Sequence, residues 1–368
     1  MNPIEILILF MSMAVLSIFL DELGFFKFLA CKVVKHAGKS QLKLFTAFYI
    51  FVSIVTLFTS NDVVILTLTP FICYSCKSAK VNPFPYVLSL FVAANVASMC
   101  FIWGNPTNIY LATSQGINFV EYFRALWLPT LCAVITAYIV LLLLFLRSLR
   151  APINCDGGEV TLGNRALVAC AVVILLVCTV LLAVASYINV EMWIVSLVSA
   201  CVLFTVALLF AAFGKRAPVE LGRTVKRAPW ILIPFLLSMF GLVWLLDKGG
   251  VTAWLGNLFA HGNAIVVFGT TSLIFANLIN NIPMSVLFTA IINSAGVGKD
   301  AIYAAVIGSN LGAMLTPIGA LAGLMWLMIL KKNNIKLGFF KFIAYGVVIT
   351  IPVAVVSYLA LWLSLSIF

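Results

Sequence analysis

Four short clusters of polar residues interrupt stretches of the sequence that are otherwise strongly apolar. Their members are Ser60, Asn61 and Asp62; Gly104, Asn105, Pro106, Thr107 and Asn108; Asn280, Asn281 and Pro283; and Asn310, Thr316, Pro317 and Gly319. Amide and hydroxyl groups bind polar solutes and ions, while glycine and proline break helices and free backbone N–H and C=O groups. An unpaired polar group in lipid costs several kcal/mol, so such breaks persist where they line a cavity. We therefore expect the four clusters to form one substrate- and ion-binding site.

Asp62 is the one carboxylate within these clusters. A carboxylate deep in a membrane costs roughly 3 kcal/mol on insertion scales, so it is normally protonated, paired or bound to a cation. Asp62 is therefore the candidate for coupling to protons or to a cation. The alternative is that Asp62 caps the helix that follows it, and the two roles can coexist. Isolated polar residues such as Asn95 and Ser98 are expected to serve helix packing.

The composition predicts an all-α polytopic membrane protein. Hydrophobic residues make up 64% of the 368 positions and charged residues 9%, whereas a soluble domain carries roughly a quarter charged residues. Six apolar stretches are suited to cross a bilayer; they cover residues 3–20, 124–146, 166–188, 192–213, 229–246 and 342–366. The first stretch is read as a membrane helix because acidic residues, and no cleavage site, follow it. The net charge is +11, and almost every Lys and Arg residue lies in the segments between the apolar stretches. This distribution is typical of membrane topology signals, so we expect no nucleic-acid partner.

The polar clusters divide the remaining apolar regions into short arms. Residues 44–76 and 264–295 each consist of two arms of about 15 residues, a length that suits a re-entrant hairpin. Residues 84–114 and 301–330 are longer and carry breaks near their middles, as broken transmembrane helices do. If both hairpins re-enter, all of the 22 Lys and Arg residues fall on one face except Arg124, Lys248 and Lys299. The positive-inside rule then places the basic face in the cytoplasm and the N-terminus outside, and we expect a multi-pass protein of the plasma membrane.

The order of these parts recurs, which predicts two inverted repeats. The first repeat is assigned to residues 1–150 and the second to residues 229–368, each with a hairpin and a broken helix. Residues 151–228 are assigned to a cytoplasmic loop, two linking transmembrane helices and a basic loop. Inverted repeats with broken helices are typical of secondary transporters that work by alternating access.

Catalytic and nucleotide-binding motifs do not occur in the sequence. There is no Walker loop and no His-Glu-x-x-His zinc motif. We therefore expect no enzyme activity, no metal or organic cofactor, and no ATPase partner, with H+ or Na+ as a possible coupling ion. Cys73 and Cys76 form a Cys-x-x-Cys pair, but within an apolar stretch packing is the better explanation.

The clusters resemble motifs of the ion transporter superfamily, which includes arsenite/antimonite permeases, NhaD-type antiporters, and citrate and dicarboxylate carriers. The resemblance is closest to arsenite permease-like anion transporters, and its most specific part is residues 277–341. It implies an elevator-type carrier, possible homodimers, and a binding site at the hairpin tips and helix breaks. The arsenite permeases usually carry Asp where this chain has Asn310, and the dicarboxylate carriers carry Ser-Asn-Thr at both tips.

The functional hypothesis is a secondary active transporter of a small anion or an arsenite-like solute, coupled to protons or sodium. A sodium/proton antiporter that uses Asp62 is the first alternative. An ion channel or a non-transporting membrane subunit is the alternative from another class. Both fit poorly with paired inverted repeats that contain broken helices.

Overall fold

The computed structural model describes residues 3–38, 40–150, 162, 164–185, 187–214 and 219–367, and every element of these residues is a helix. The first set of helices is α1 (Pro3–Glu22), α2 (Phe25–Ala37), α3 (Gln41–Phe58), α4 (Asn61–Ser78), α5 (Phe84–Ala97), the 3-10 turn η1 (Ile102–Gly104), α6 (Pro106–Thr113) and α7 (Phe119–Leu149). Three linking helices follow: α8 (Arg165–Val184), α9 (Met192–Phe213) and α10 (Val219–Arg227). The last set is α11 (Leu232–Lys248), α12 (Val251–Phe259), α13 (Ala264–Ile279), α14 (Asn281–Ala295), α15 (Lys299–Gly312), the 3-10 turn η2 (Pro317–Gly319), α16 (Leu321–Lys332) and α17 (Phe339–Ile367). The prediction of an all-α polytopic protein is confirmed.

The last set of helices repeats the order of the first. A helix and a short helix lead into a helical pair, α3–α4 or α13–α14, and then into a helix broken by a 3-10 turn. The first arms of the broken helices, α5 and α15, both have 14 residues, and the closing helices α7 and α17 have 31 and 29. The division into inverted repeats at 1–150 and 229–368 nevertheless stays a prediction. Residues 151–161 and 215–218 of the predicted loops lie outside the described residues.

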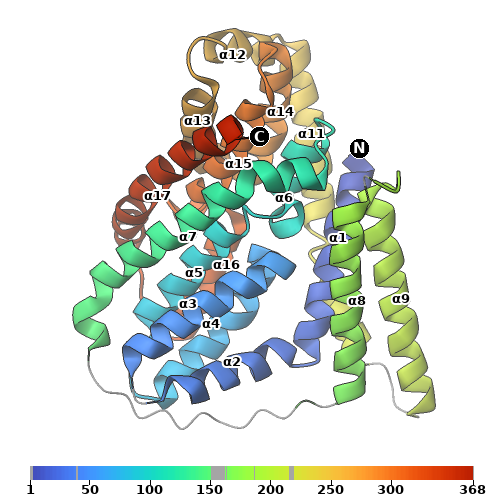
Figure 1. The fold of residues 1–368 in the computed structure, drawn as a ribbon, viewed down its shortest axis with the longest axis vertical. Coiled ribbons are helices and arrows are strands. Elements are labelled where there is room, and N and C mark those ends of the chain that lie inside the picture. The colour runs from blue at the N-terminus through green and yellow to red at the C-terminus, as the bar shows by residue number, and fades with distance from the viewer. Residues whose placement is uncertain are drawn as a thin grey trace.

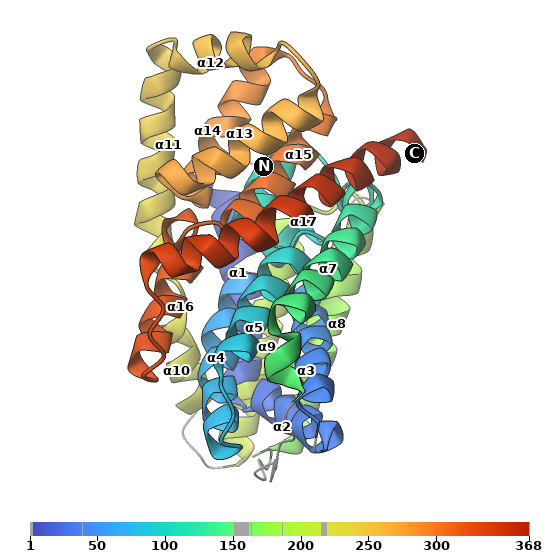
Figure 2. The ribbon, with the colours of Figure 1, turned by 90° about the vertical axis from the view of Figure 1, so that its left-hand side faces the viewer.

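The two helical pairs occupy opposite ends of the molecule (Figures 1 and 2). α3 and α4 lie in the lower part, whereas α13 and α14 lie at the top. The closing helices α7 and α17 pack against each other and cross the molecule diagonally between these ends. α8 and α9 pack beside α1 at one side. The broken helices therefore meet in the middle, between the two pairs.

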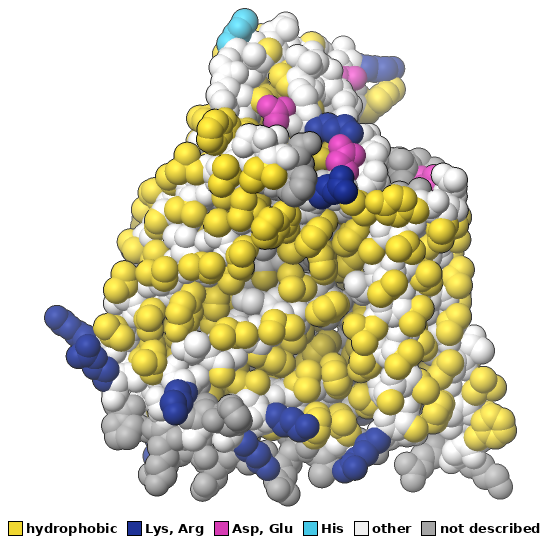
Figure 3. All heavy atoms as spheres, in the orientation of Figure 1, with side chains coloured by type: hydrophobic (Ala, Val, Ile, Leu, Met, Phe, Trp, Pro, Cys, Tyr) yellow, Lys and Arg dark blue, Asp and Glu magenta, His cyan; other side chains and the backbone are white. Residues whose placement is uncertain are grey.

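The surface carries the belt of apolar side chains that a bilayer requires. Figure 3 shows this belt across the middle of one face, with Lys and Arg side chains gathered along the lower edge. Six described helices are long and apolar enough to cross a membrane, or seven if the bent α11–α12 pair is one span. They include α3, which at 18 residues is longer than the hairpin arm expected from the sequence. The chain is a multi-pass membrane protein, and the outward N-terminus stays a prediction.

The second helical pair packs closely against the second broken helix because small residues line their contact. A Cβ atom added at Gly308 of α15 would lie 2.0 Å from Ser272 Oγ and 2.4 Å from the Gly269 carbonyl oxygen of α13. A Cβ at Gly312 would lie 2.8 Å from the Leu273 carbonyl oxygen. Small residues let membrane helices approach at backbone distance. This close contact holds the break after α15 against the end of α13.

Candidate functional site

Asn310 lies at the centre of the polar clusters and joins the two broken helices. Its Oδ1 accepts hydrogen bonds from Ser98 Oγ and Asn105 Nδ2, each at 2.9 Å. Its Nδ2 donates to Asn108 Oδ1 at 2.7 Å and to the Val306 carbonyl oxygen at 2.8 Å. The side chain is fully buried. One amide thus connects α15 to both sides of the break between α5 and α6.

A second contact runs beside the first. Ser309 Oγ donates to Thr107 Oγ1 at 3.0 Å, and both side chains are fully buried. Ser309 and Thr107 therefore satisfy each other across the two broken helices, which avoids the cost of leaving these buried hydroxyl groups unpaired. The two helices are joined by side chains that carry no charge.

The break between α5 and α6 depends on three residues, Gly104, Asn105 and Asn108, whose types fit its geometry. A Cβ at Gly104 would lie 2.2 Å from the Ser98 carbonyl oxygen, so glycine is required there. Asn105 Oδ1 accepts from the Thr107 backbone N–H at 3.2 Å and caps α6, which begins at Pro106. Asn108 Nδ2 donates to the Ser98 carbonyl oxygen at 2.8 Å. The Ser98 carbonyl group, which the break leaves without a helical partner, is therefore hydrogen-bonded by the side-chain amide of Asn108 in α6.

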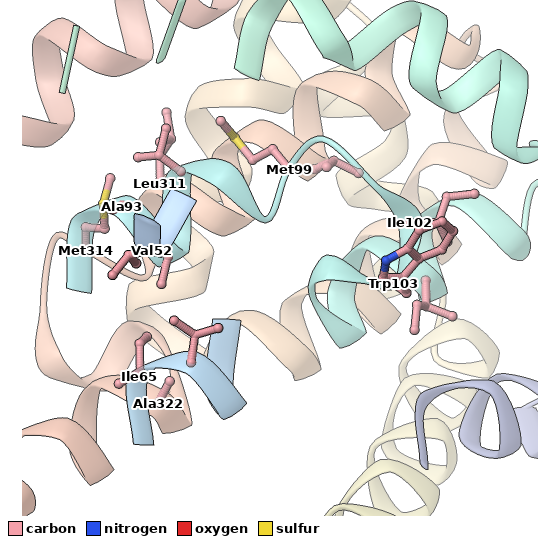
Figure 4. Packing of buried hydrophobic residues seen from close by; sticks show 14 of the residues in the cluster. Val52, Ile65, Ala93, Met99, Ile102, Trp103, Leu311, Met314 and Ala322 are labelled. Atoms are coloured by element: carbon pink, nitrogen blue, oxygen red, sulfur yellow. The ribbon is translucent and has the colours of Figure 1, made fainter. Parts of the chain in front are cut away.

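Figure 4 shows the apolar residues that surround this break. Met99, Ile102 and Trp103 lie along it, and the Trp103 ring stacks on Phe119 of α7 with centroids 5.2 Å apart. Trp103 Nε1 donates to the Leu57 carbonyl oxygen at 3.0 Å, near the end of α3. The break is thus packed against both the closing helix and the first helical pair.

The tip between α3 and α4, which we call hairpin tip 1 (residues 59–62), is buried against α5. Asn61 Nδ2 donates to Asn95 Oδ1 at 3.2 Å, and both side chains are buried. Ser60 Oγ is buried and has no hydrogen-bond partner among the described residues. Asp62 is partly exposed, and its carboxylate makes no hydrogen bond or ion pair with the residues the structure describes. Tip 1 therefore offers an unused hydroxyl and an unused carboxylate.

The tip between α13 and α14, which we call hairpin tip 2 (residues 277–283), meets the second break. Asn280 has φ 76° and ψ 151°, a strained backbone conformation outside the left-handed helical region that essentially only glycine adopts readily. Its Oδ1 accepts from the Ile282 N–H, and its Nδ2 donates to the Ile318 carbonyl oxygen at 3.0 Å. Thr316 Oγ1 donates to Asn277 Oδ1 at 2.7 Å. Two side-chain contacts thus bind tip 2 to the residues around η2.

The contacts connect all four clusters in one continuous path. Asn61 reaches Asn95, Ser98 Oγ lies 2.8 Å from the Asn95 carbonyl oxygen, and Ser98 also reaches Asn310. On the far side, a Cβ at Gly319 would lie 2.6 Å from the Gly312 carbonyl oxygen, so η2 packs on the end of α15. Asn280 then closes the path to tip 2. Asn281 and Pro283 are buried in the first turn of α14, and Pro317 is buried in η2.

The sequence predicts a packing role for Asn95 and Ser98, yet both side chains belong to this path. Ser309 also belongs to it. The spacing of Asn95 and Ser98 is the sequence feature that indicates their role. The two residues are three positions apart, so they share a helix face, and they lie just before the first break. In the sequence, Ser309 stands in the same polar cluster as Asn310.

The electrostatic character of the path comes from helix ends rather than charged side chains. Helices α4, α6, α14 and α16 all begin at its breaks, and the first N–H groups of a helix carry partial positive charge. Asp62 is the only ionisable side chain within the four clusters. The described residues contain no group of three or more His, Cys, Asp or Glu that could hold a metal ion. The arrangement therefore suits a neutral polar or weakly anionic solute.

A cavity of about 690 Å³ lies outside these clusters. Its walls include Glu121 and Arg124 of α7 and Lys299 and Tyr303 of α15. Lys299 Nζ pairs with Glu121 Oε1 at 2.6 Å across the two helices. At the clusters themselves, by contrast, Asn310 and its partners fill the space between the broken helices.

Comparison with known proteins agrees with this architecture. The family described as Citrate transporter matches residues 3–305. The chain belongs to the citrate transporter family. An arsenical pump membrane protein of Escherichia coli is 30% identical over 97% of this chain and 86% of its own length. A transporter of Mycobacterium tuberculosis is 24% identical over 99% of this chain and 87% of its own length.

A solved structure shares the fold of this citrate transporter family member. The YdaH transporter of Alcanivorax borkumensis, whose topology is described as unusual, aligns with a TM-score of 0.58. The alignment covers 96% of this chain and 84% of that chain, at 14% sequence identity. The resemblance to arsenite permease-like members of the ion transporter superfamily is confirmed, and the chain is a membrane transporter of the citrate transporter and arsenical pump group.

Proposed function

We propose that this protein is a secondary active transporter of an arsenite-like solute or another small anion, coupled to protons or sodium. The observation that carries the proposal is the uncharged, buried network around Asn310, where two broken helices from different parts of the chain meet. Its amide and hydroxyl groups match a small hydroxylated solute with several donors and acceptors. The arsenical pump membrane protein at 30% identity supports the same solute class.

The neutral character of the site favours an undissociated arsenite-like acid over a multiply charged carboxylate. The four clusters contain no Lys, Arg or His, and helix ends supply only partial charge. A citrate-sized anion would leave uncompensated charge in a low-dielectric site unless cations accompanied it. An undissociated metalloid hydroxide carries no such charge, and its hydroxyl groups replace hydrogen bonds that water would make.

Transport would follow alternating access of the elevator type. The helical pairs at opposite ends of the molecule would each uncover the central path to one side in turn. The hydrogen bonds of Asn310 to the first break would hold the closed arrangement and would be exchanged for contacts to the solute. The protein would act in the plasma membrane with its N-terminus outside, and a homodimer is the assembly we expect from the superfamily resemblance.

The test is a solute panel on purified protein in proteoliposomes. Uptake of arsenite, antimonite, sulfate, citrate and succinate is measured with and without an imposed pH gradient and with and without a sodium gradient. Gradient-stimulated arsenite or antimonite uptake, reduced by excess unlabelled solute, is the expected result. Uptake of citrate or succinate alone would overturn the preference for a neutral solute. Uptake that ignores every gradient would overturn secondary active transport.

A sodium/proton antiporter is the second candidate, because the Asp62 carboxylate has no partner among the described residues. A membrane-embedded carboxylate in that situation is commonly a proton or cation carrier. Everted membrane vesicles that hold a pH-sensitive dye distinguish this function. Sodium-induced dequenching of the dye without added arsenite would favour sodium/proton antiport. If sodium causes no dequenching but the protein takes up arsenite, the result favours transport of an arsenite-like solute.

A further inference from the structure

A buried carboxylate lies at the C-terminal end of α1, outside the four clusters. Asp21 is 5% exposed, although an isolated buried charge is strongly unfavourable. Its Oδ2 pairs with Arg227 Nη1 at 2.7 Å, and Arg227 also pairs with Glu22 at 2.5 Å. Arg227 is the last residue of α10, which leads into the second set of helices. This ion-pair cluster therefore connects the first helix to the linker.

The same carboxylate oxygen also contacts hairpin 1, the α3–α4 pair. Thr67 Oγ1 of α4 donates to Asp21 Oδ2 at 3.0 Å, and Thr67 is buried. The other oxygen, Asp21 Oδ1, is buried and finds no hydrogen-bond partner in the part of the chain that the structure describes. Hydrogen bonds to charged groups are the stronger ones, about 1.5–3 kcal/mol in net stability. Thr67 therefore makes one of the few favourable contacts available to this carboxylate.

We propose that Asp21 is a positioning residue that, held by Arg227, fixes the α4 arm of hairpin 1 through Thr67. Thr67 follows Asn61 by six residues, which places it about 9 Å along the helix axis from tip 1. A contact at that distance restrains the direction of the arm without touching the solute path. The contact between Thr67 and Asp21 thereby positions Ser60, Asn61 and Asp62 against α5.

The corresponding position in the second set of helices does not restrain hairpin 2, the α13–α14 pair. Asp247 ends α11 as Asp21 ends α1, but it accepts a hydrogen bond from Thr252 of the neighbouring short helix α12. Hairpin 2 instead meets α6 and the two residues after it, where Gln115 Nε2 donates to Asn293 Oδ1 at 2.6 Å. The carboxylate restraint thus acts on one hairpin, and the other hairpin serves as an internal reference.

Thr67→Val and Thr67→Ser form the matched pair for the test. Valine has the shape of threonine without its hydroxyl group, so it removes the hydrogen bond to Asp21. Serine keeps the hydroxyl group. A general role of Thr67 in packing would make serine, which loses a methyl group, the more damaging change. A positioning role predicts the opposite order, with serine close to the wild type.

The readout is hydrogen–deuterium exchange of the full-length protein in lipid nanodiscs. We expect exchange over residues 55–70 to accelerate about tenfold in Thr67→Val, equivalent to ~1.4 kcal/mol, and to stay near wild type in Thr67→Ser. Exchange over residues 275–290 should not change in either variant. Arg227→Gln should act in the same direction as Thr67→Val, and its side chain is 42% exposed, so it tests the proposal even if the valine variant does not fold.

Equal exchange in the valine and serine variants would overturn the proposal, as would equal acceleration of both hairpins. Unchanged exchange over residues 55–70 in Arg227→Gln would likewise refute the role of the ion pair. The inference rests on hairpin 1 forming part of the proposed transport site. The exchange experiment measures the order of hairpin 1 and does not measure solute flux. The positioning role of Asp21 can therefore be refuted while the proposed transport function stands, and the transport function can be refuted while the positioning role stands.

Discussion

Asn310→Ala is the substitution that probes the proposed site most directly. The change removes a fully buried side chain with four hydrogen bonds. Asn105 Nδ2 loses its partner, and Asn108 Oδ1 keeps only a 3.5 Å contact to Thr107. Ser98 retains the Asn95 carbonyl oxygen as an acceptor. Two buried polar atoms are therefore left poorly satisfied.

The expected cost follows from these two atoms. Each unsatisfied buried polar group costs about 1–3 kcal/mol, so Asn310→Ala should destabilise the protein by about 2–6 kcal/mol. The void left by the amide adds to this cost. Arsenite uptake per folded protein should fall at least about tenfold, because the residue that joins the two broken helices at the proposed site is absent.

Thermal unfolding in detergent and uptake in proteoliposomes, normalised to folded protein, measure the two effects. Ser98→Ala is the control, since Asn310 Oδ1 keeps Asn105 as a donor and the cost should stay near 1 kcal/mol. An Asn310→Ala protein as stable as Ser98→Ala would refute the hydrogen-bond argument. Reduced stability with normal uptake per folded molecule would refute the role of Asn310 in transport and leave it a packing residue.

Three further predictions follow from other parts of the structure. Gly308→Ala should abolish folding, because its Cβ would lie 2.4 Å from the backbone of α13, whereas Gly241→Ala on the open surface of α11 should be tolerated; size-exclusion profiles of the expressed proteins measure this. Asp62→Asn should abolish gradient-driven uptake while leaving the melting temperature unchanged, since the carboxylate has no partner to lose among the described residues. Thiol reagents that do not cross membranes should label Lys77→Cys only from the cytoplasm and Lys248→Cys only from outside, above the wild-type background.

Each of these predictions has an outcome that contradicts it. A normal profile for Gly308→Ala would mean that α13 and α15 can separate without penalty. Undiminished response of Asp62→Asn to pH and sodium gradients would remove this carboxylate from coupling. Labelling of Lys77→Cys from outside would place the hairpin 1 loop on the wrong side and break the predicted topology.

The sequence predicts the apolar helices and the positions of their breaks, but residues 219–227, expected in a basic loop, form the helix α10. Length and hydrophobicity locate helices in lipid because every backbone group there must be paired within the helix. Glycine and proline with amides at the interruptions, as at Gly104 and Pro106, mark the places where that pairing stops. Such signals are local, so they can be recognised without knowledge of the fold. The lengths of the two hairpin arms are harder to predict from the sequence. The first arm, α3, has 18 residues and is longer than the arm expected.

Partnership between distant residues could not be read from the sequence. Nothing local distinguishes Asn95 or Ser98 from an asparagine or serine that only packs a helix, and only the approach of α15 gives Ser98 its contact with Asn310. Asp21 and Glu22 look like an ordinary acidic end of a membrane helix. The fold buries Asp21 between Arg227 and Thr67, residues that lie 206 and 46 positions further along the chain.

Local sequence pattern is enough to predict a helical membrane transporter with polar breaks whose residue types suit a small polar solute. The convergence of the breaks on Asn310 and the contact of the Asp21 carboxylate with hairpin 1 arise only when the helices pack together. The physical reason is that helix formation in lipid depends on neighbours along the chain, whereas the pairing of buried polar side chains depends on which helices are brought together.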